Sequence, residues 1–172
     1  MWSNILLIIL LIICVSTDLK SRKIYNAVLF PILFTALIIH TIMGGLGGLS
    51  HAVLGTIVGL SILLIPFLLG GMGAGDVKLL AVIGGIKGIW FVLFTSFYMA
   101  LAGGVIAVFI LLFHKGFKKR MKQIILFFHG LLNGVKFPII SDAVGMKTTY
   151  PYGVAIAAGA IYQAFFSGGF PI

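Results

Sequence analysis

Residues 70–80 read GGMGAGDVKLL, and this stretch joins two long apolar runs of the chain. Four of its first six residues are glycine, and its single acid, Asp76, stands directly before the apolar run 77–86. The whole sequence contains only two other acidic side chains, Asp18 and Asp142. One of only three acids therefore lies between a glycine-rich loop and an apolar helix, and this unusual position requires an explanation.

The composition around this stretch indicates a membrane protein. Hydrophobic residues make up 61% of the chain and charged residues 9%, whereas about a quarter of the residues of a soluble domain are charged. The chain cannot cover an ordinary water-facing surface, which predicts a polytopic membrane protein. The net charge of +9 comes from basic residues clustered between apolar runs, and this favours anionic lipid as a partner. No stretch interleaves basic and aromatic residues as a nucleic-acid groove does, so no nucleic-acid partner is predicted.

The apolar runs predict the architecture. They cover approximately residues 1–17, 25–43, 49–69, 77–86, 89–113 and 150–166. We expect an all-α bundle of about six transmembrane helices that forms a single domain over residues 1–172. Segment 114–149 carries apolar residues at helical spacing with Lys or Arg on much of the other face, which predicts an amphipathic helix in the cytoplasmic interface. His129 and Asn133 interrupt it and disfavour a seventh span.

The basic residues predict the orientation. The first apolar run has no positive charge before it and is followed by Lys20, Arg22 and Lys23, which is the reverse of the order in a cleaved signal peptide. With six spans and both termini outside, Lys87 is the only basic residue placed outside. This asymmetry predicts a multi-pass protein of the plasma (inner) membrane whose basic loops face the cytoplasm.

Asp18 and Asp76 are expected on the same side of the membrane, because two predicted spans separate them. The positive-inside asymmetry makes this the cytoplasmic side. Taken singly, each acid has a simple alternative role, as a helix cap or as a solvated loop residue. As a pair, two nearby carboxyls can share one proton, so that one activates a water and the other donates to a substrate carbonyl. This is the chemistry of an aspartic protease.

The glycines before Asp76 suggest how a peptide reaches the two acids. Peptide cleavage needs an extended strand held beside the carboxyls, and glycine permits close approach of another backbone. Gly73 and Gly75 are therefore candidates for a substrate-approach loop. The loop lacks the ending of a phosphate loop and the surroundings of a dinucleotide fingerprint. The histidines show no metal-binding spacing and Cys14 is the single cysteine, so we expect neither a metal nor another cofactor.

Three stretches together resemble a known family. They are DLKSRKIYN (18–26), GAGDVKLLA (73–81) and YPYGVAIAAGA (150–160). They resemble the first aspartate motif, the GxGD motif and the last helix of the type IV prepilin peptidases, membrane aspartic proteases that include the archaeal preflagellin peptidases. The resemblance implies a catalytic dyad of Asp18 and Asp76. It also implies cleavage of the short basic leader of prepilin-like substrates on the cytoplasmic side.

The resemblance has departures that refine the expectation. Tyr25 stands where the family usually has proline, and Val154 stands where proline often follows the glycine; neither position carries chemistry. The paired Cys-x-x-Cys motifs of the long, methylating members are absent from this sequence. We therefore expect a peptidase without the methyltransferase region, similar to the short members that serve Flp-type pili and to archaeal relatives.

Two residues near the acids are candidate supporting residues, Asn26 and Lys78. If the Lys78 side chain pointed at the dyad it would oppose the raised pKa that a shared proton needs, and the alternative is an anchor at the lipid headgroups. Gly55 and Gly59 have the spacing that lets two helix backbones approach, and internal packing is the simpler use of it than dimerisation. The sequence does not fix the oligomeric state.

Two other classes of protein fit part of the sequence. Membrane aspartates also serve proton- or cation-coupled transporters, and glycine-broken helices line transport sites. Against a transporter, both acids are predicted near one edge of the membrane and not at its midplane. A non-catalytic component of a pilus or secretion assembly is the other alternative.

Overall fold

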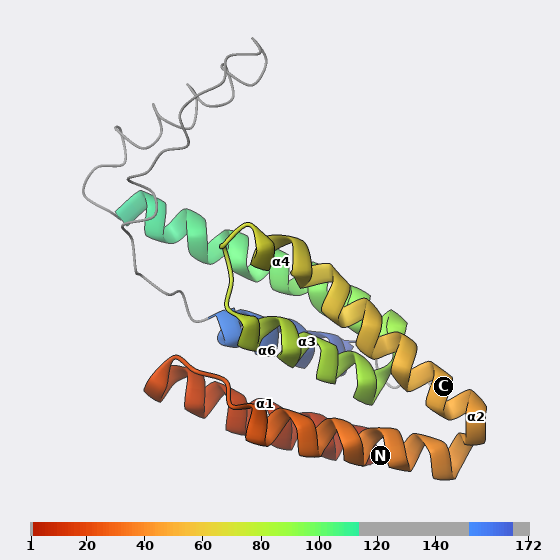
Figure 1. The fold of residues 1–172 in the computed structure, drawn as a ribbon. Helices are drawn as coiled ribbons and strands as arrows, with labels where there is room; N and C mark the ends of the chain where they lie inside the picture. The colour runs from red at the N-terminus through yellow and green to blue at the C-terminus, as the bar shows by residue number, and fades with distance from the viewer. Residues whose placement is uncertain (1, 114–151, 167–172) are drawn as a thin grey trace. The chain divides into compact units, whose positions relative to one another are not determined.

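The computed structural model describes residues 2–113 and 152–166, which form five helices (Figure 1). These are α1 (Trp2–Ser21), α2 (Asn26–Leu68), α3 (Ala74–Lys87), α4 (Ile89–Phe113) and α6 (Tyr152–Phe166). No strand occurs among these residues, and the all-α prediction is confirmed. The predicted interfacial segment 114–149 and Asp142 lie outside the described residues.

The chain divides into two compact units, one of Met1–Gly103 with Pro151–Ile172 and one of Gly104–Tyr150. The described part of the second unit is the helical end of α4. The first unit contains α1, α2, α3, the first part of α4, and α6.

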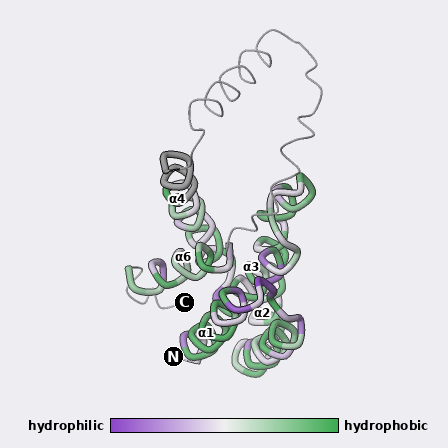
Figure 2. The backbone as a smooth tube through the Cα atoms, turned by 90° about the vertical axis from the view of Figure 1, so that its left-hand side faces the viewer, coloured by the Kyte–Doolittle hydropathy of each residue, from purple (hydrophilic) through white to green (hydrophobic). Residues whose placement is uncertain are grey.

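Two of the described helices, α1 and α2, are long and apolar enough to cross a membrane. Figure 2 shows that the helices are hydrophobic over most of their length and that hydrophilic residues are confined to short segments. Many large apolar side chains point outward, among them Ile42, Leu46 and Phe165. Such a surface suits lipid and not water, so the protein is a membrane protein.

Helix α2 is a helical hairpin. Its 43 residues would extend roughly 65 Å as one straight helix, about twice the hydrocarbon thickness of a bilayer. Gly45 breaks the helix with φ 56° and ψ −142°, a left-handed conformation that glycine adopts readily. Beyond the break the chain returns so closely that a Cβ on Gly48 would collide with the carbonyl oxygen of His40. The two halves correspond to the predicted runs 25–43 and 49–69.

Helix α3 packs against the returning half of α2 with almost no side chain between the two backbones. A Cβ built on Gly55 would collide with the carbonyl oxygen of Gly84, and one on Gly59 would lie 2.5 Å from the carbonyl oxygen of Leu80. Where lipid surrounds a bundle, close van der Waals packing of this kind is a main force that holds helices together. The predicted use of Gly55 and Gly59 in internal packing is confirmed.

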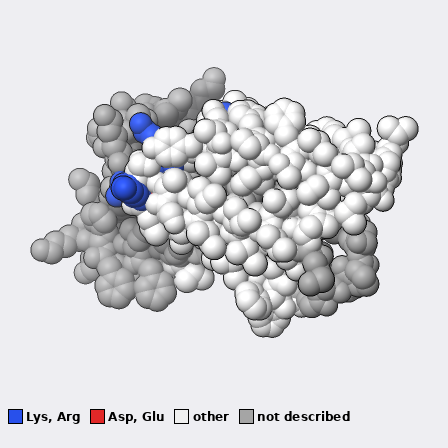
Figure 3. Space-filling model, turned by 90° about the horizontal axis from the view of Figure 1, so that it is seen from below, with Lys and Arg blue, Asp and Glu red and all other residues white. Residues whose placement is uncertain are grey.

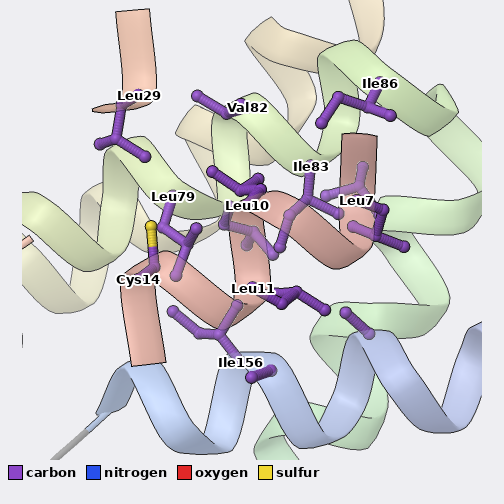
Figure 4. Close-up of a cluster of buried hydrophobic side chains, with 14 of the residues drawn as sticks. Leu7, Leu10, Leu11, Cys14, Leu29, Leu79, Val82, Ile83, Ile86 and Ile156 are labelled. Carbon is purple, nitrogen blue, oxygen red and sulfur yellow. The ribbon is translucent and has the colours of Figure 1, made fainter. Parts of the chain in front are cut away.

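A buried cluster joins α1, α3 and α6 (Figure 4). Leu7 and Leu10 of α1, Leu79 and Ile83 of α3, and Ile156 of α6 are each at most 1% exposed. These side chains come from three helices that pack against one another. Since α3 contacts α1, α2 and α6, it lies between these three helices. The central position of α3 matters for the site, because α3 carries Asp76 at its first turn.

The far end of α3 is tied to its neighbours by polar contacts. Lys87 donates a hydrogen bond to the side-chain oxygen of Asn4 and lies 5.3 Å from the centre of the Phe91 ring. His40 makes a hydrogen bond of 3.2 Å with the carbonyl oxygen of Ile86. These contacts fix α3 against α1, α2 and α4 at the end opposite Asp76.

Candidate active site

Asp18 lies on the buried face of α1, close to its end. The buried residues Leu7, Leu11, Cys14 and Asp18 follow each other at intervals of three and four, which places them on one helix face. The helix ends just beyond, where the N–H of Arg22 donates to the carbonyl oxygen of Asp18 at 2.8 Å. Because Asp18 continues an apolar face, its side chain is turned into the bundle and is only 7% exposed.

Asp76 is held by the glycine that precedes its helix. The N–H of Gly73 donates to Oδ2 of Asp76 at 3.2 Å, and the N–H of Asp76 donates to the carbonyl oxygen of Gly73 at 3.1 Å. This reciprocal pair satisfies two backbone groups at the start of α3, as a capping box does. The Asp76 side chain is thereby fixed at the helix start and is 9% exposed.

The two acids lie within electrostatic reach of each other. Burial raises the pKa of Asp76 to about 6, the Gly73 N–H acts against this rise, and the charge of Asp18 adds to it. Helices α1 and α3 are in contact, so the end of one and the start of the other bring the two carboxyls to the same end of the bundle. A carboxyl whose pKa is near neutral, beside a second carboxyl, can hold the proton that acid–base chemistry needs.

Gly73 and Gly75 belong to the start of α3 more than to an open loop. Gly73 is the residue before the helix, and its N–H is occupied by Asp76. Gly75 lies in the first turn, where a Cβ would be 3.0 Å from the Cβ of Ile24. Both glycines thus have a packing or capping reason visible in the fold, and their role toward a substrate remains a prediction.

The side chain of Lys78 contacts two residues of α2. Its Nζ donates to the side-chain oxygen of Asn26 at 3.1 Å and lies 5.9 Å from the centre of the Phe30 ring. Burial, Gly73 and Asp18 account for the shifted pKa of Asp76, and Lys78 is not among the causes. Asn26 and Lys78 therefore join the start of α2 to α3, and their role as supporting residues stays a prediction.

Gly153 is a site residue to which no sequence motif assigned a role. It is the second residue of α6, and a Cβ built on it would lie 2.7 Å from Oδ2 of Asp18. The available signal was the glycine in the sequence Pro-Tyr-Gly at the start of the last apolar run, because glycine permits the close approach of another group. What lies against that glycine is visible only in three dimensions.

Basic residues lie close to both acids in the sequence. Lys20, Arg22 and Lys23 follow Asp18, and Lys78 follows Asp76 by two residues. Among the basic residues that the structure describes, only Lys87 lies at the other end of α3. Figure 3 shows Lys and Arg side chains in one half of the face it presents and an uncharged surface over the rest of the described atoms. This asymmetry matches the charge pattern of a membrane protein with one cytoplasmic edge.

These features define a class of protein: a helical membrane protein with two buried carboxyls at one edge of its bundle. The sequence model of the type IV leader peptidase family matches residues 5–108, more than half of the chain and including both Asp18 and Asp76. The chain belongs to the type IV leader peptidase family and is a membrane-associated protease. Comparisons with curated proteins and with solved structures gave no match.

Proposed function

We propose that the chain is an aspartic endopeptidase that removes the short basic leader of type IV prepilin-like substrates, of the Flp-type or preflagellin-like kind. Membership of the leader peptidase family supports a substrate of the prepilin kind. The observation that carries the aspartic mechanism is the buried pair, in which the charge of Asp18 helps to raise the pKa of Asp76 to about 6 after the larger effect of burial. A proton shared by two carboxyls near neutral pH is what an aspartic protease requires.

The proposed topology places this pair at the cytoplasmic face. The proposed spans are the apolar runs 1–17, 25–43, 49–69, 77–86, 89–113 and 150–166, with segment 114–149 in the interface, so that Asp18 and Asp76 each lie just outside a span. An even number of spans puts both termini on the same side of the membrane, and the distribution of basic residues makes this the outside. The end of α1 and the start of α3 then face the cytoplasm together with Lys20, Arg22 and Lys23, in agreement with the positive-inside rule.

The proposed reaction is the direct attack of water on the scissile carbonyl, without an acyl-enzyme. One carboxylate removes a proton from the water while the water oxygen bonds to the carbonyl carbon, and the protonated carboxyl donates to the carbonyl oxygen. The resulting diol collapses when the C–N bond breaks: the leaving nitrogen takes a proton from one carboxyl of the dyad, and the other carboxylate takes a proton from a diol hydroxyl. Water is the only other reactant, and the dyad returns to its singly protonated state.

The membrane contributes to substrate selection in this proposal. A prepilin has a basic leader followed by an apolar helix, so its helix lies in the bilayer and its cleavage site lies at the interface. Anionic lipid attracts both the leader and the basic edge of the enzyme. The substrate strand then lies near Gly73 and Gly75, beside the two carboxyls.

Reconstitution tests the proposal directly. The purified protein in vesicles of phosphatidylethanolamine and phosphatidylglycerol is mixed with a synthetic prepilin segment, a basic leader followed by an apolar helix. We expect one cut at the junction between leader and helix, insensitive to metal chelators and to inhibitors of serine and cysteine proteases. Failure to cut any prepilin segment, together with a proton or cation flux that depends on Asp76, would instead identify a transporter.

The pH profile of this reaction follows from the pKa of Asp76. A pKa raised from 3.8 to about 6 means that the proton of the pair is held up to about pH 6 and is lost above it. We therefore expect kcat/KM, which reports the free enzyme, to fall as the pH rises through about 6. The measurement is initial cleavage rate against pH at low substrate concentration. A profile that stays flat from pH 5 to pH 8, on the order of a thousandfold range in proton concentration, would contradict the shared proton.

Lys78 should have little effect on this profile. Because its ammonium group donates to Asn26 and does not act on the dyad, Lys78→Met is expected to retain kcat/KM within about fivefold of wild type. The pH at which activity falls should stay the same, and Lys87→Met at the other end of α3 is the matched control. A fall in activity that moves to higher pH in Lys78→Met alone would show that Lys78 does stabilise the ionised dyad.

A further inference from the structure

The start of α6 packs closely against the carboxyl group of Asp18. A Cβ at Gly153 would lie 2.7 Å from Oδ2 and 3.1 Å from Cγ of Asp18. Any residue other than glycine at this position would therefore collide with the carboxyl. The first N–H groups of a helix have no partner within the helix. At this helix start the N–H of Gly153 acts on the carboxyl of Asp18, a residue that is 7% exposed.

Burial raises the pKa of Asp18, and two groups act against that rise. They are the backbone N–H of Gly153 and the positive charge of Arg22, both of which favour the ionised form. The Gly153 contact is looser than a full hydrogen bond, since Oδ2 is buried without a hydrogen-bond partner among the described residues. The N-terminal end of the 15-residue helix α6 adds the positive end of the helix dipole.

The surroundings of Asp76 differ. Its carboxyl accepts one hydrogen bond from Gly73, and the charged group that acts on it is the anion of Asp18, which favours the protonated form. The nearest basic residue along its own helix, Lys78, is directed to Asn26. Among the described groups, a cation therefore acts on Asp18 and none acts on Asp76.

We infer that Gly153 is a positioning residue that holds Asp18 in its ionised form against the start of α6, so that the proton of the pair resides on Asp76. The inference rests on the proposed aspartic mechanism and assigns its roles. Asp18 removes a proton from the attacking water, and Asp76 donates its proton to the carbonyl oxygen. As the diol collapses, Asp76 takes back a proton from one hydroxyl and Asp18 gives its proton to the leaving nitrogen, which restores the starting state.

The absence of glutamate makes the protonation states directly measurable. The chain contains three acidic side chains, all aspartate, so ¹³Cγ-labelled aspartate in an Asp142→Asn background gives NMR signals from the two dyad residues alone. Further replacement of Asp18 or Asp76 by Asn assigns each signal. We expect the Asp76 signal to change protonation state at a higher pH than the Asp18 signal. The reverse order would overturn the inference.

Gly153→Ala tests the positioning role itself. We expect the Asp18 signal to titrate roughly one pH unit higher than in wild type, because contact with a backbone N–H favours the charged form. Unchanged titration of both residues would reject a role for Gly153. Gly47→Ala is the matched control, since a Cβ at Gly47 meets nothing within 4 Å.

A stability measurement covers the case in which Gly153→Ala folds poorly. The collision is with the Asp18 carboxyl, so the loss of thermal stability caused by Gly153→Ala should largely disappear when Asp18 is replaced by alanine as well. An equal loss in both backgrounds would place the collision elsewhere and reject the inference. Neither the titration nor the unfolding experiment uses a substrate, so both can succeed or fail independently of whether the protein cleaves a prepilin.

Discussion

Replacement of Asp18 or of Asp76 by asparagine is expected to lower the rate of leader cleavage by about 10³- to 10⁴-fold. The amide keeps the size of the side chain but can neither take a proton from water nor give one to the carbonyl oxygen, and positioned acid–base groups contribute about 10²- to 10⁴-fold each. The two carboxyls act as a unit, so the double variant should be no slower than about the slower single variant. Single-turnover cleavage in vesicles measures the effect.

The third acid provides the matched control. Asp142 is the only other acidic side chain of the chain, and its neighbours Ser141 and Gly145 indicate a solvated loop residue. Asp142→Asn should therefore cleave at the wild-type rate. The proposed dyad is rejected if either Asp18→Asn or Asp76→Asn retains more than about a tenth of the wild-type rate.

Stability should not explain the loss of activity. Burial of a carboxylate is costly, since burial is the largest cause of the raised pKa of Asp76, and a neutral amide avoids that cost. We expect both asparagine variants to insert into the membrane in normal amounts and to unfold at or above the wild-type temperature. Loss of cleavage in a fully folded variant then reports on the chemistry alone.

Patterns along the chain predicted the helices because each depends on local composition. The apolar runs around Gly45 predicted two spans, and the structure has two half-helices there, although it joins them into one element with a break. The parity of the spans placed Asp18 and Asp76 at one edge without any knowledge of packing. Both inferences need only the order of residues and the thickness of a bilayer.

Contacts between distant segments could not be predicted in the same way. The sequence alone does not decide whether Lys78 points to the dyad or to the lipid headgroups, and in the structure its ammonium group donates to Asn26, which is 52 residues away. Gly153 lies against Asp18 although most of the chain separates the two residues in sequence, and a single sequence does not show that they are neighbours in space. Gly55 and Gly59 predicted that a helix approaches closely, but not that this helix is α3, that Gly84 faces Gly55 or that Leu80 faces Gly59.

Substitution of Gly55 or Gly84 by alanine is expected to destabilise the bundle by about 2–3 kcal/mol, a typical cost of overpacking. Each Cβ would point at the carbonyl oxygen of the other glycine, and a backbone oxygen, unlike the end of a flexible side chain, cannot move aside without moving its helix. The free energy of unfolding, measured by titration of folded protein from mild detergent into SDS, tests this. Gly47→Ala, on the same helix but facing open space, should be neutral or up to about 1 kcal/mol more stable, because alanine favours the helix.

The double variant shows whether the two glycines share one gap. If either Cβ already forces α2 and α3 apart, the second finds room, so the combined loss for Gly55→Ala with Gly84→Ala should fall clearly below the sum of the single losses. Additive losses, or a Gly55→Ala variant as stable as Gly47→Ala, would contradict the close packing. Because α3 carries Asp76, a separation of about 1 Å should also slow cleavage by about 10²-fold in the folded fraction. The glycines that hold these two helices together are thus expected to influence the chemistry through the position of one carboxyl.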